Sequence, residues 1–231
     1  MTAQRPPGKV PRMRIDIVFD TVCPWCFVGK RRFDRALKMR PNIKPEIRYR
    51  SFLLNPDLPA QGVDRREYLD RKFGGSQQYD RIVEALVFTG KGEGINFALD
   101  KIKRTPNSAS SHRFVRLAQT VGRQHEAVEA LFTGYFERGL DIGNVEVLIR
   151  LAEEAGIERH MAHAHLSSDS DVNAVYTENA RMHRLGITGV PCYIFNEGRA
   201  IAGAQEPDIL VKMLDMAVAQ ESDRMPMQSA G

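Results

Sequence analysis

The chain has 231 residues, of which 42% are hydrophobic and 27% are charged, and its formal net charge is +4. This balance is ordinary for a globular protein and excludes disordered and fibrous chains. The basic residues stand in short runs without interleaved aromatic side chains, which argues against a nucleic-acid-binding surface. No apolar stretch reaches the 18 residues needed to span a membrane.

The first part of the chain predicts a strand, a helix and a second strand. Residues 1–12 carry three prolines and are expected to form a flexible arm. Charged and apolar residues alternate at 14–19 and again at 46–52, which is typical of strands. Between them, Pro24 suits the first turn of a helix that Pro41 ends. Because a helix connects the strands, we expect them to be parallel, joined by a right-handed crossover.

From about residue 64, helical periodicity replaces the alternation. The helical patterns fall at 64–74, 78–90, 110–122, 124–139 and 144–156. Several end at a glycine, as helices often do. None of them alternates like a strand. The sequence therefore predicts an all-helical insertion of about a hundred residues, which is long enough for a separate lobe.

The last part of the chain predicts a helix, a hairpin and a closing helix. The first helix is expected at 171–186. Two short strands at 192–195 and 200–203 flank the turn Asn-Glu-Gly and predict an antiparallel hairpin. The segment 206–220 has helical spacing, and the tail 221–231 is expected to fray.

This order of elements predicts an α/β protein, β-α-β … α-β-β-α, with an insertion in the middle. We expect residues 13–62 and 171–220 to form one discontinuous domain. Residues 63–170 are expected to form the helical insert domain between its two parts.

Two of the three cysteines, Cys23 and Cys26, enclose a Pro-Trp pair directly after the first predicted strand. Structural zinc is one explanation, but a closed zinc site needs four ligands, and Cys192 is the only further thiol. The other candidate ligands are three histidines in an expected helix of the insertion, His160, His163 and His165. Plain packing is a second explanation, since an unpaired cysteine is often a small core residue.

A redox dithiol explains both the spacing and the position of the pair. At the N-cap of a helix, the sulfur of Cys23 would face free N–H groups and the positive end of the helix dipole. Both effects favour the thiolate and lower the pKa of a cysteine. Cys26 would lie beneath Cys23 as the resolving thiol. Pro24 would restrict the loop, and Trp25 would offer an apolar surface to a substrate.

Four motifs of the chain together resemble a known family. They are "DTVCPWCFVGKRRF", "LLNPDLPAQGVDRREYLDRKFG", "IKRTPNSASSHR" and "LGITGVPCYIF…GAQ". They are similar to motifs of the DsbA-like thioredoxin-fold oxidoreductases, and more closely to those of the FrnE branch, over residues 14–218. The resemblance implies a thioredoxin-like fold with a large all-helical insertion, and a protein thiol–disulfide oxidoreductase.

The resemblance also implies that Val190–Pro191 is a cis peptide facing the dithiol, and that Val190 pairs with an incoming peptide through its backbone. From the residues alone, a trans proline that starts an edge strand is the alternative. Relatives usually carry an apolar aromatic residue where this chain has Cys192. That thiol is expected to be a small core residue, with capture of the oxidised pair as the alternative.

Six further positions have polar side chains with open roles. Asp20 is expected either to cap the turn before the cysteines or to tune them, in which case it would raise a thiol pKa. The basic residues at 30–32 are expected to be solvated. Asn107 is expected to border the cleft or to cap the next helix, and His112 to lie at the surface or in a cleft wall.

The predicted function is therefore protein thiol–disulfide exchange, without a metal or an organic cofactor, and with glutathione as a candidate co-substrate. The expected partners are thiols and disulfides of proteins or small molecules, not nucleic acids or membranes. The N-terminus lacks the apolar core of a secretory signal, so the expected localisation is the cytoplasm, where most cysteines stay reduced. No basic side chain lies between the cysteines, so the oxidising or reducing direction stays open.

Two other classes of function remain as alternatives. One is a glutathione-dependent isomerase or transferase that resembles 2-hydroxychromene-2-carboxylate isomerase, whose relatives have serine in place of the first cysteine. Its small aromatic substrate would lie in the helical insertion. The other is a partner-binding or chaperone module that uses Trp25 and the cleft.

Overall fold

The computed structural model describes residues 13–224, except 75 and 197 and the side chains of 76–78 and 221–224. The expected arm, 1–12, and the end of the expected tail, 225–231, lie outside the described residues. The boundaries of the insert domain at 63 and 170 remain a prediction.

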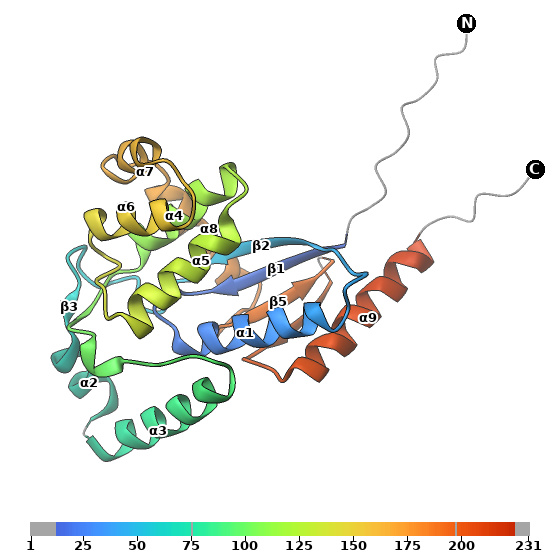
Figure 1. Ribbon diagram of the computed structural model, residues 1–231, viewed down its shortest axis with the longest axis horizontal. Coiled ribbons are helices and arrows are strands. Elements are labelled where there is room, and N and C mark those ends of the chain that lie inside the picture. The colour runs from blue at the N-terminus through green and yellow to red at the C-terminus, as the bar shows by residue number, and fades with distance from the viewer. Residues whose placement is uncertain (1–12, 75, 197, 225–231) are drawn as a thin grey trace, which may run out of the picture.

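A four-stranded mixed sheet forms the centre of the protein, in the order β2-β1-β5-β6 (Figure 1). Strand β1 (Arg14–Phe19) pairs in parallel with β2 (Glu46–Ser51), and helix α1 (Pro24–Lys38) connects them. Strands β5 (Cys192–Phe195) and β6 (Arg199–Ala202) form an antiparallel hairpin next to β1. The predicted βαβ unit and the predicted hairpin are both confirmed.

Helices cover both faces of this sheet. Helix α9 (Pro207–Arg224) packs beside α1 on one face, and α8 (Val172–Arg184) packs against β2 on the other. The alternation in β1 explains this arrangement, because Ile15 and Phe19 join the α1 core while Val18 joins the core beneath α8. Helix α9 continues to Arg224, four residues into the segment that was expected to fray.

The insertion between β2 and β5 is mainly helical, as predicted. Its helices are α2 (Arg65–Phe73), α3 (Ser76–Gly92), α4 (Ala109–Thr120), α5 (Gln124–Phe132), α6 (Val145–Glu154) and α7 (Arg159–Leu166), with a 3-10 turn η1 (Leu99–Lys101) and a π-helical stretch η2 (Thr133–Glu137). The expectation that it holds no strand is wrong. Strands β3 (Val63–Asp64) and β4 (Arg104–Thr105) form a two-residue antiparallel pair, which is too short to show alternation.

One apolar core joins the insertion to the sheet. The ring of Phe132 from α5 stacks on Phe27 of α1, with ring centroids 5.2 Å apart, and meets Phe19 of β1 edge-on at 6.0 Å. Such aromatic contacts add to the area that they bury. The insertion is therefore packed directly against the start of α1. In the part of the chain that the structure describes, no helix has the length and apolar character to cross a bilayer.

Candidate active site

The two cysteines lie where β1 ends and α1 begins. The backbone N–H of Cys23 donates to the carbonyl of Asp20 at 3.1 Å, which closes the turn after the strand. Cys23 is the N-cap of α1, and Pro24 is its first residue, as predicted. Cys26 is one turn into the helix, and its N–H donates to the carbonyl of Cys23 at 3.0 Å. The helix start thus brings the two thiols together.

Both cysteines are free thiols and both are buried, Cys23 at 6% and Cys26 at 3% exposure. Burial raises the pKa of Cys26 well above its usual range, and the hydrogen bond and charge of Cys23 raise it further. The two thiols therefore lie close together, and burial favours the protonated form of Cys26. This is the expected character of a resolving thiol.

The thiol of Cys23 points to the loop before β5. Its Sγ donates to the carbonyl oxygen of Val190 at 3.7 Å, and Cys23 makes no side-chain capping hydrogen bond to α1. The expected contact between this sulfur and the free N–H groups of the helix is therefore not made in the dithiol. A thiol has a proton to donate, so it faces a carbonyl instead.

The peptide bond between Val190 and Pro191 is cis, which confirms the expectation from the resemblance. This loop lies close to α1. A Cβ at Gly29 would stand 2.6 Å from the hydroxyl of Tyr193 and 2.9 Å from Cγ of Pro191. Glycine at this position lets the helix that carries the cysteines approach the loop that faces them.

Trp25 is partly exposed, at 37%, as expected for a residue that offers apolar surface beside the thiols. Leu54, which follows β2, is exposed to a similar extent, 38%. Its backbone N–H donates to Oδ2 of Asp20 at 2.7 Å, so the same carboxylate that underlies the cysteine turn also holds this loop.

Cys192 is separated from the dithiol by the sheet. It is buried with Val18, Phe52, Met182 and Ile187 on the face that α8 covers, and burial raises its pKa. Its register partner in β1 is Val18, whose side chain points away from α1. This position supports the packing interpretation and argues against direct capture of Cys26.

Two buried polar residues complete the site, and their environment was not predicted. Asp20 and His112 both have no exposed surface, and Nε2 of His112 lies 3.5 Å from Oδ1 of Asp20. The expectation that His112 lies at the surface or in a cleft wall is wrong. Helix α4 turns it inward, onto the ring of Phe19. The polar run at 107–112 is typical of a surface segment, but its hydroxyl groups are hydrogen-bonded within the protein. The hydroxyl oxygens of Ser111 and Thr21, for example, lie 2.7 Å apart.

The expectation that residues 30–32 are solvated is also wrong. Lys30 is only 4% exposed and bonds to Asp34 and Glu129, both at 2.9 Å. Arg31 and Arg32 are partly buried in ion pairs, with Glu129 and Glu93 respectively. These contacts join α1 to the insertion.

Asn107 lies directly before the N-cap of α4, which is Ser108, and it supports the helix start through its side chain without being the cap itself. Its Oδ1 accepts from the N–H of Ala109, the first residue of α4, at 2.9 Å. Its amide group donates to the carbonyl of Leu58 at 2.7 Å. Asn107 therefore fixes the start of the helix that carries His112.

The three histidines considered as zinc ligands all lie on α7. They are His160, His163 and His165. Across the described residues, no three histidine, cysteine or acidic side chains are placed to hold a metal ion. Helix α7 packs mainly against α6 and α4.

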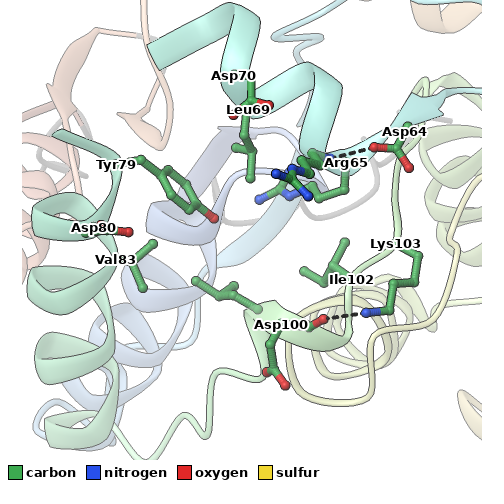
Figure 2. Close-up of a pocket in the computed structure, with 12 residues that line it drawn as sticks. Asp64, Arg65, Leu69, Asp70, Tyr79, Asp80, Val83, Asp100, Ile102 and Lys103 are labelled. Carbon is green, nitrogen blue, oxygen red and sulfur yellow. Dashed lines mark hydrogen bonds between the residues drawn. The ribbon is translucent and has the colours of Figure 1, made fainter. Parts of the chain in front are cut away.

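A pocket of about 490 Å³ lies within the insertion, between α2, α3 and η1 (Figure 2). Its wall combines apolar residues such as Leu69 and Val83 with charged residues of both signs, among them Arg65, Asp80 and Lys103. No residue of the dithiol or of the cis-proline loop lines it. A small molecule bound there would not touch the thiols.

Comparison with known proteins agrees with this geometry. Residues 14–215 match the family model of the DSBA-like thioredoxin domain. The uncharacterized protein YwbO of Bacillus subtilis is 26% identical over 204 residues, which are 87% of this chain and 96% of that protein. The crystal structure of a probable DsbA oxidoreductase from Streptomyces coelicolor is 28% identical, with a TM-score of 0.82, over 95% of this chain and 94% of that one.

A more distant structure shares the fold. The cytosolic disulfide reductase DsbM from Pseudomonas aeruginosa, determined with GSH, is 18% identical, with a TM-score of 0.65, over 89% of this chain and 99% of that one. The family match covers most of this chain, including both cysteines and the cis-proline loop.

Proposed function

This chain belongs to the DsbA-like thioredoxin family, and we propose that it exchanges disulfides with proteins through Cys23 and Cys26. One observation carries the proposal. Two adjacent free thiols stand at the start of α1, and the Sγ of the first lies 3.7 Å from the carbonyl of Val190, directly before the cis-proline. Cys23 is the nucleophile and Cys26 the resolving thiol.

In the reducing direction, the thiolate of Cys23 attacks a substrate disulfide. A bond forms between Cys23 and one substrate sulfur, the substrate S–S bond breaks, and the second substrate sulfur leaves as a thiolate that takes a proton. Cys26 then loses its proton and attacks Cys23. The Cys23–Cys26 disulfide forms, and the first substrate thiol is released. Two electrons pass to the substrate, and the reverse sequence oxidises a dithiol.

The second step needs a proton acceptor, because burial keeps Cys26 protonated. Asp20 is the carboxylate whose charge acts on Cys26, and it is fully buried beneath the turn. We therefore assign Asp20 as the acceptor of the Cys26 proton. The same negative charge raises the pKa of this thiol, which couples the two groups.

The substrate side of the proposal rests on exposed groups around the thiols. Trp25 supplies apolar contact, and the backbone of Val190 supplies pairing to an extended peptide. The FrnE branch, glutathione as co-substrate and a cytoplasmic location belong to the same proposal. The motifs around the cysteines support the first, and the fold shared with a cytosolic reductase determined with GSH supports the other two.

Reduction of insulin by dithiothreitol tests the proposal. Catalysis by the native chain should be abolished in Cys23→Ala, while Cys192→Ala, which removes a buried thiol on the other face of the sheet, should retain it. Equal rates for the native chain and Cys23→Ala would refute exchange through this pair. The reduction potential of the pair then decides the direction: a value near −270 mV, as in thioredoxin, indicates a reductant, and one near about −120 mV an oxidant.

The two other classes of function have less support. The isomerase alternative requires a hydroxyl at the first position of the motif, where this chain has Cys23. Its expected substrate site in the insertion has no contact with the dithiol, since the pocket there lacks both cysteines. A chaperone module would protect unfolded insulin from aggregation equally well with and without Cys23.

A further inference from the structure

His112 is a buried side chain with few polar contacts. Its ring has no exposed surface, and among the described residues neither Nδ1 nor Nε2 has a hydrogen-bond partner. Burying a polar group without a partner is unfavourable, because the group loses its hydrogen bonds to water. An apolar side chain would avoid that cost at the same place against the ring of Phe19, whose centroid is 5.1 Å away. Packing alone therefore does not explain a histidine here.

The charged group that His112 faces is the carboxylate of Asp20. Nε2 lies 3.5 Å from Oδ1, which is longer than a good hydrogen bond. The other oxygen, Oδ2, already accepts from the N–H of Leu54 at 2.7 Å. Oδ1 also accepts hydrogen bonds from the N–H of Val22 at 3.3 Å and from the hydroxyl of Thr21 at 3.5 Å. The hydrogen bonds that this oxygen accepts are therefore all long.

Asp20 in turn acts on Cys26. The backbone carbonyl of Asp20 accepts from the N–H of Cys23 at 3.1 Å, which places this residue beneath the cysteine turn, and its carboxylate charge disfavours the Cys26 thiolate. Asp20, His112 and Cys26 thus form a buried series that runs from α4, in the insertion, to the second thiol. A change at one end alters the charge that Cys26 meets when it must lose its proton.

We propose that His112 is a positioning residue for the resolving step, which acts on Cys26 through Asp20. This inference rests on the proposed function. In the mixed disulfide, the proton of Cys26 moves to Oδ1 of Asp20, and the Cys26 thiolate attacks Cys23. The Cys23–Cys26 bond forms, and the substrate sulfur leaves with the electron pair of the broken bond and takes a proton.

The role of His112 in this step is to hold Oδ1. The contacts at 3.3–3.5 Å leave that oxygen able to accept a proton, and the imidazole, with Nε2 3.5 Å away, limits how far the carboxylate can turn from the buried side of the turn. The insertion therefore contributes to the chemistry of a dithiol that belongs entirely to the β1–α1 junction. It does so from a helix whose start is fixed by Asn107.

The test separates the two steps of exchange. Reduced protein is mixed with oxidised glutathione and quenched with acid at intervals, and mass spectrometry measures the mixed disulfide and the intramolecular disulfide. Trp25, the only tryptophan of the chain, follows the redox state by fluorescence in parallel. We expect His112→Leu to slow resolution about 10-fold or more, and to change formation of the mixed disulfide by less than about twofold, because Cys23 performs that step.

Isosteric variants give a second measure that does not depend on the leucine variant folding. The amide nitrogen of His112→Gln can occupy the place of Nε2, so this variant should resolve faster than His112→Asn, whose amide reaches only the place of Nδ1. Phe114→Leu is the packing control, because Phe114 is equally buried on α4. It should resolve at the native rate. In an Asp20→Asn background, His112→Leu should have no further effect.

Three outcomes would overturn the inference: native resolution in His112→Leu, equal slowing in Phe114→Leu, or the same slowing by His112→Leu with and without Asp20. The failure of the proposed function would look different. In that case, the native chain would form no mixed disulfide at Cys23 with oxidised glutathione and would not reduce insulin.

Discussion

Two polar clusters lie beside α1, one fully buried and one built around the buried Lys30, and they differ in how completely their members are paired. The first, Asp20 with His112, precedes the helix, and the nearest approach of the two side chains is 3.5 Å, between Nε2 and Oδ1. The second surrounds Lys30, two turns along, whose Nζ meets Asp34 and Glu129 at 2.9 Å and His125 at 3.1 Å. The fully paired cluster fastens the insertion to the helix, while the loosely paired one stands beside the dithiol.

The ionisation of the second cluster reflects its pairing. Burial by itself would raise the pKa of Glu129, but the neighbouring Lys30 and Arg31 outweigh it, and the net shift is downward. Burial lowers the pKa of His125, and the charge of Lys30 lowers it further. Lys30 therefore favours the charge states of Glu129 and His125 that hold α1 and α5 together.

Removing Lys30 should produce the largest effect on stability. Lys30→Ala would leave Asp34 and Glu129 close together without their buried cation, and we expect the free energy of unfolding to fall by about 3 kcal/mol. Urea unfolding followed by circular dichroism measures this. Arg138→Ala is the matched control, because it breaks an exposed pair with Glu154 and should cost less than about 1 kcal/mol. Equal losses in the two variants would show that the Lys30 cluster is no stronger than a surface pair.

The first cluster should respond in the opposite direction. Asp20→Asn removes a buried charge while its amide oxygen can still accept from the N–H of Leu54, so we expect the free energy of unfolding to rise by about 1–2 kcal/mol.

The same substitution should lower the pKa of Cys26, because the charge of Asp20 disfavours the thiolate. The pH dependence of alkylation by iodoacetamide, in a background with Cys23→Ala and Cys192→Ala, measures this. A loss of stability in Asp20→Asn would instead mean that the carboxylate holds the loop.

The smallest expected effect is on the pH dependence of stability. His125 has a lowered pKa in the folded protein, so the unfolded chain takes up a proton first as the pH falls. The neutral ring therefore contributes its full stability at pH values above 6.5, the ordinary pKa of histidine. This contribution is lost as the pH falls from 6.5 towards the lower pKa that His125 has in the folded protein. His125→Gln should therefore lose less stability than the native chain between pH 7 and pH 5.5 in urea titrations. If His125→Gln and the native chain lose the same stability over this pH range, the pH dependence comes from other groups. His165 is one of them, because burial lowers its pKa as well.

Much of the frame could be predicted from the sequence, because its signals are local. The alternation in β1 and β2, Pro24 at the first turn and the short hairpin turn each depend on a few neighbouring residues. The spacing of Cys23 and Cys26 and their place at a helix start follow from the same local pattern. The two-residue strands β3 and β4 were missed because they are shorter than any periodicity.

The partners of the polar residues could not be predicted in the same way. Thr21 and Ser111 are 90 positions apart, and Lys30 and His125 are 95 apart, so no local pattern relates them. His112 follows a polar run typical of a surface segment, yet that run is buried because its hydroxyls and Asn107 bond within the protein. Cys192 next to Pro191 reads as a neighbour of the dithiol, although the pleat of β5 turns it to the opposite face.

By itself, the sequence determined which elements form and which two sulfurs share a helix end, because backbone preferences and side-chain periods act over a few residues. Only the tertiary structure decided which charges are buried, and against what. The loss of solvent around a carboxylate or an imidazole depends on segments that are distant in the chain and meet when the insertion packs onto α1.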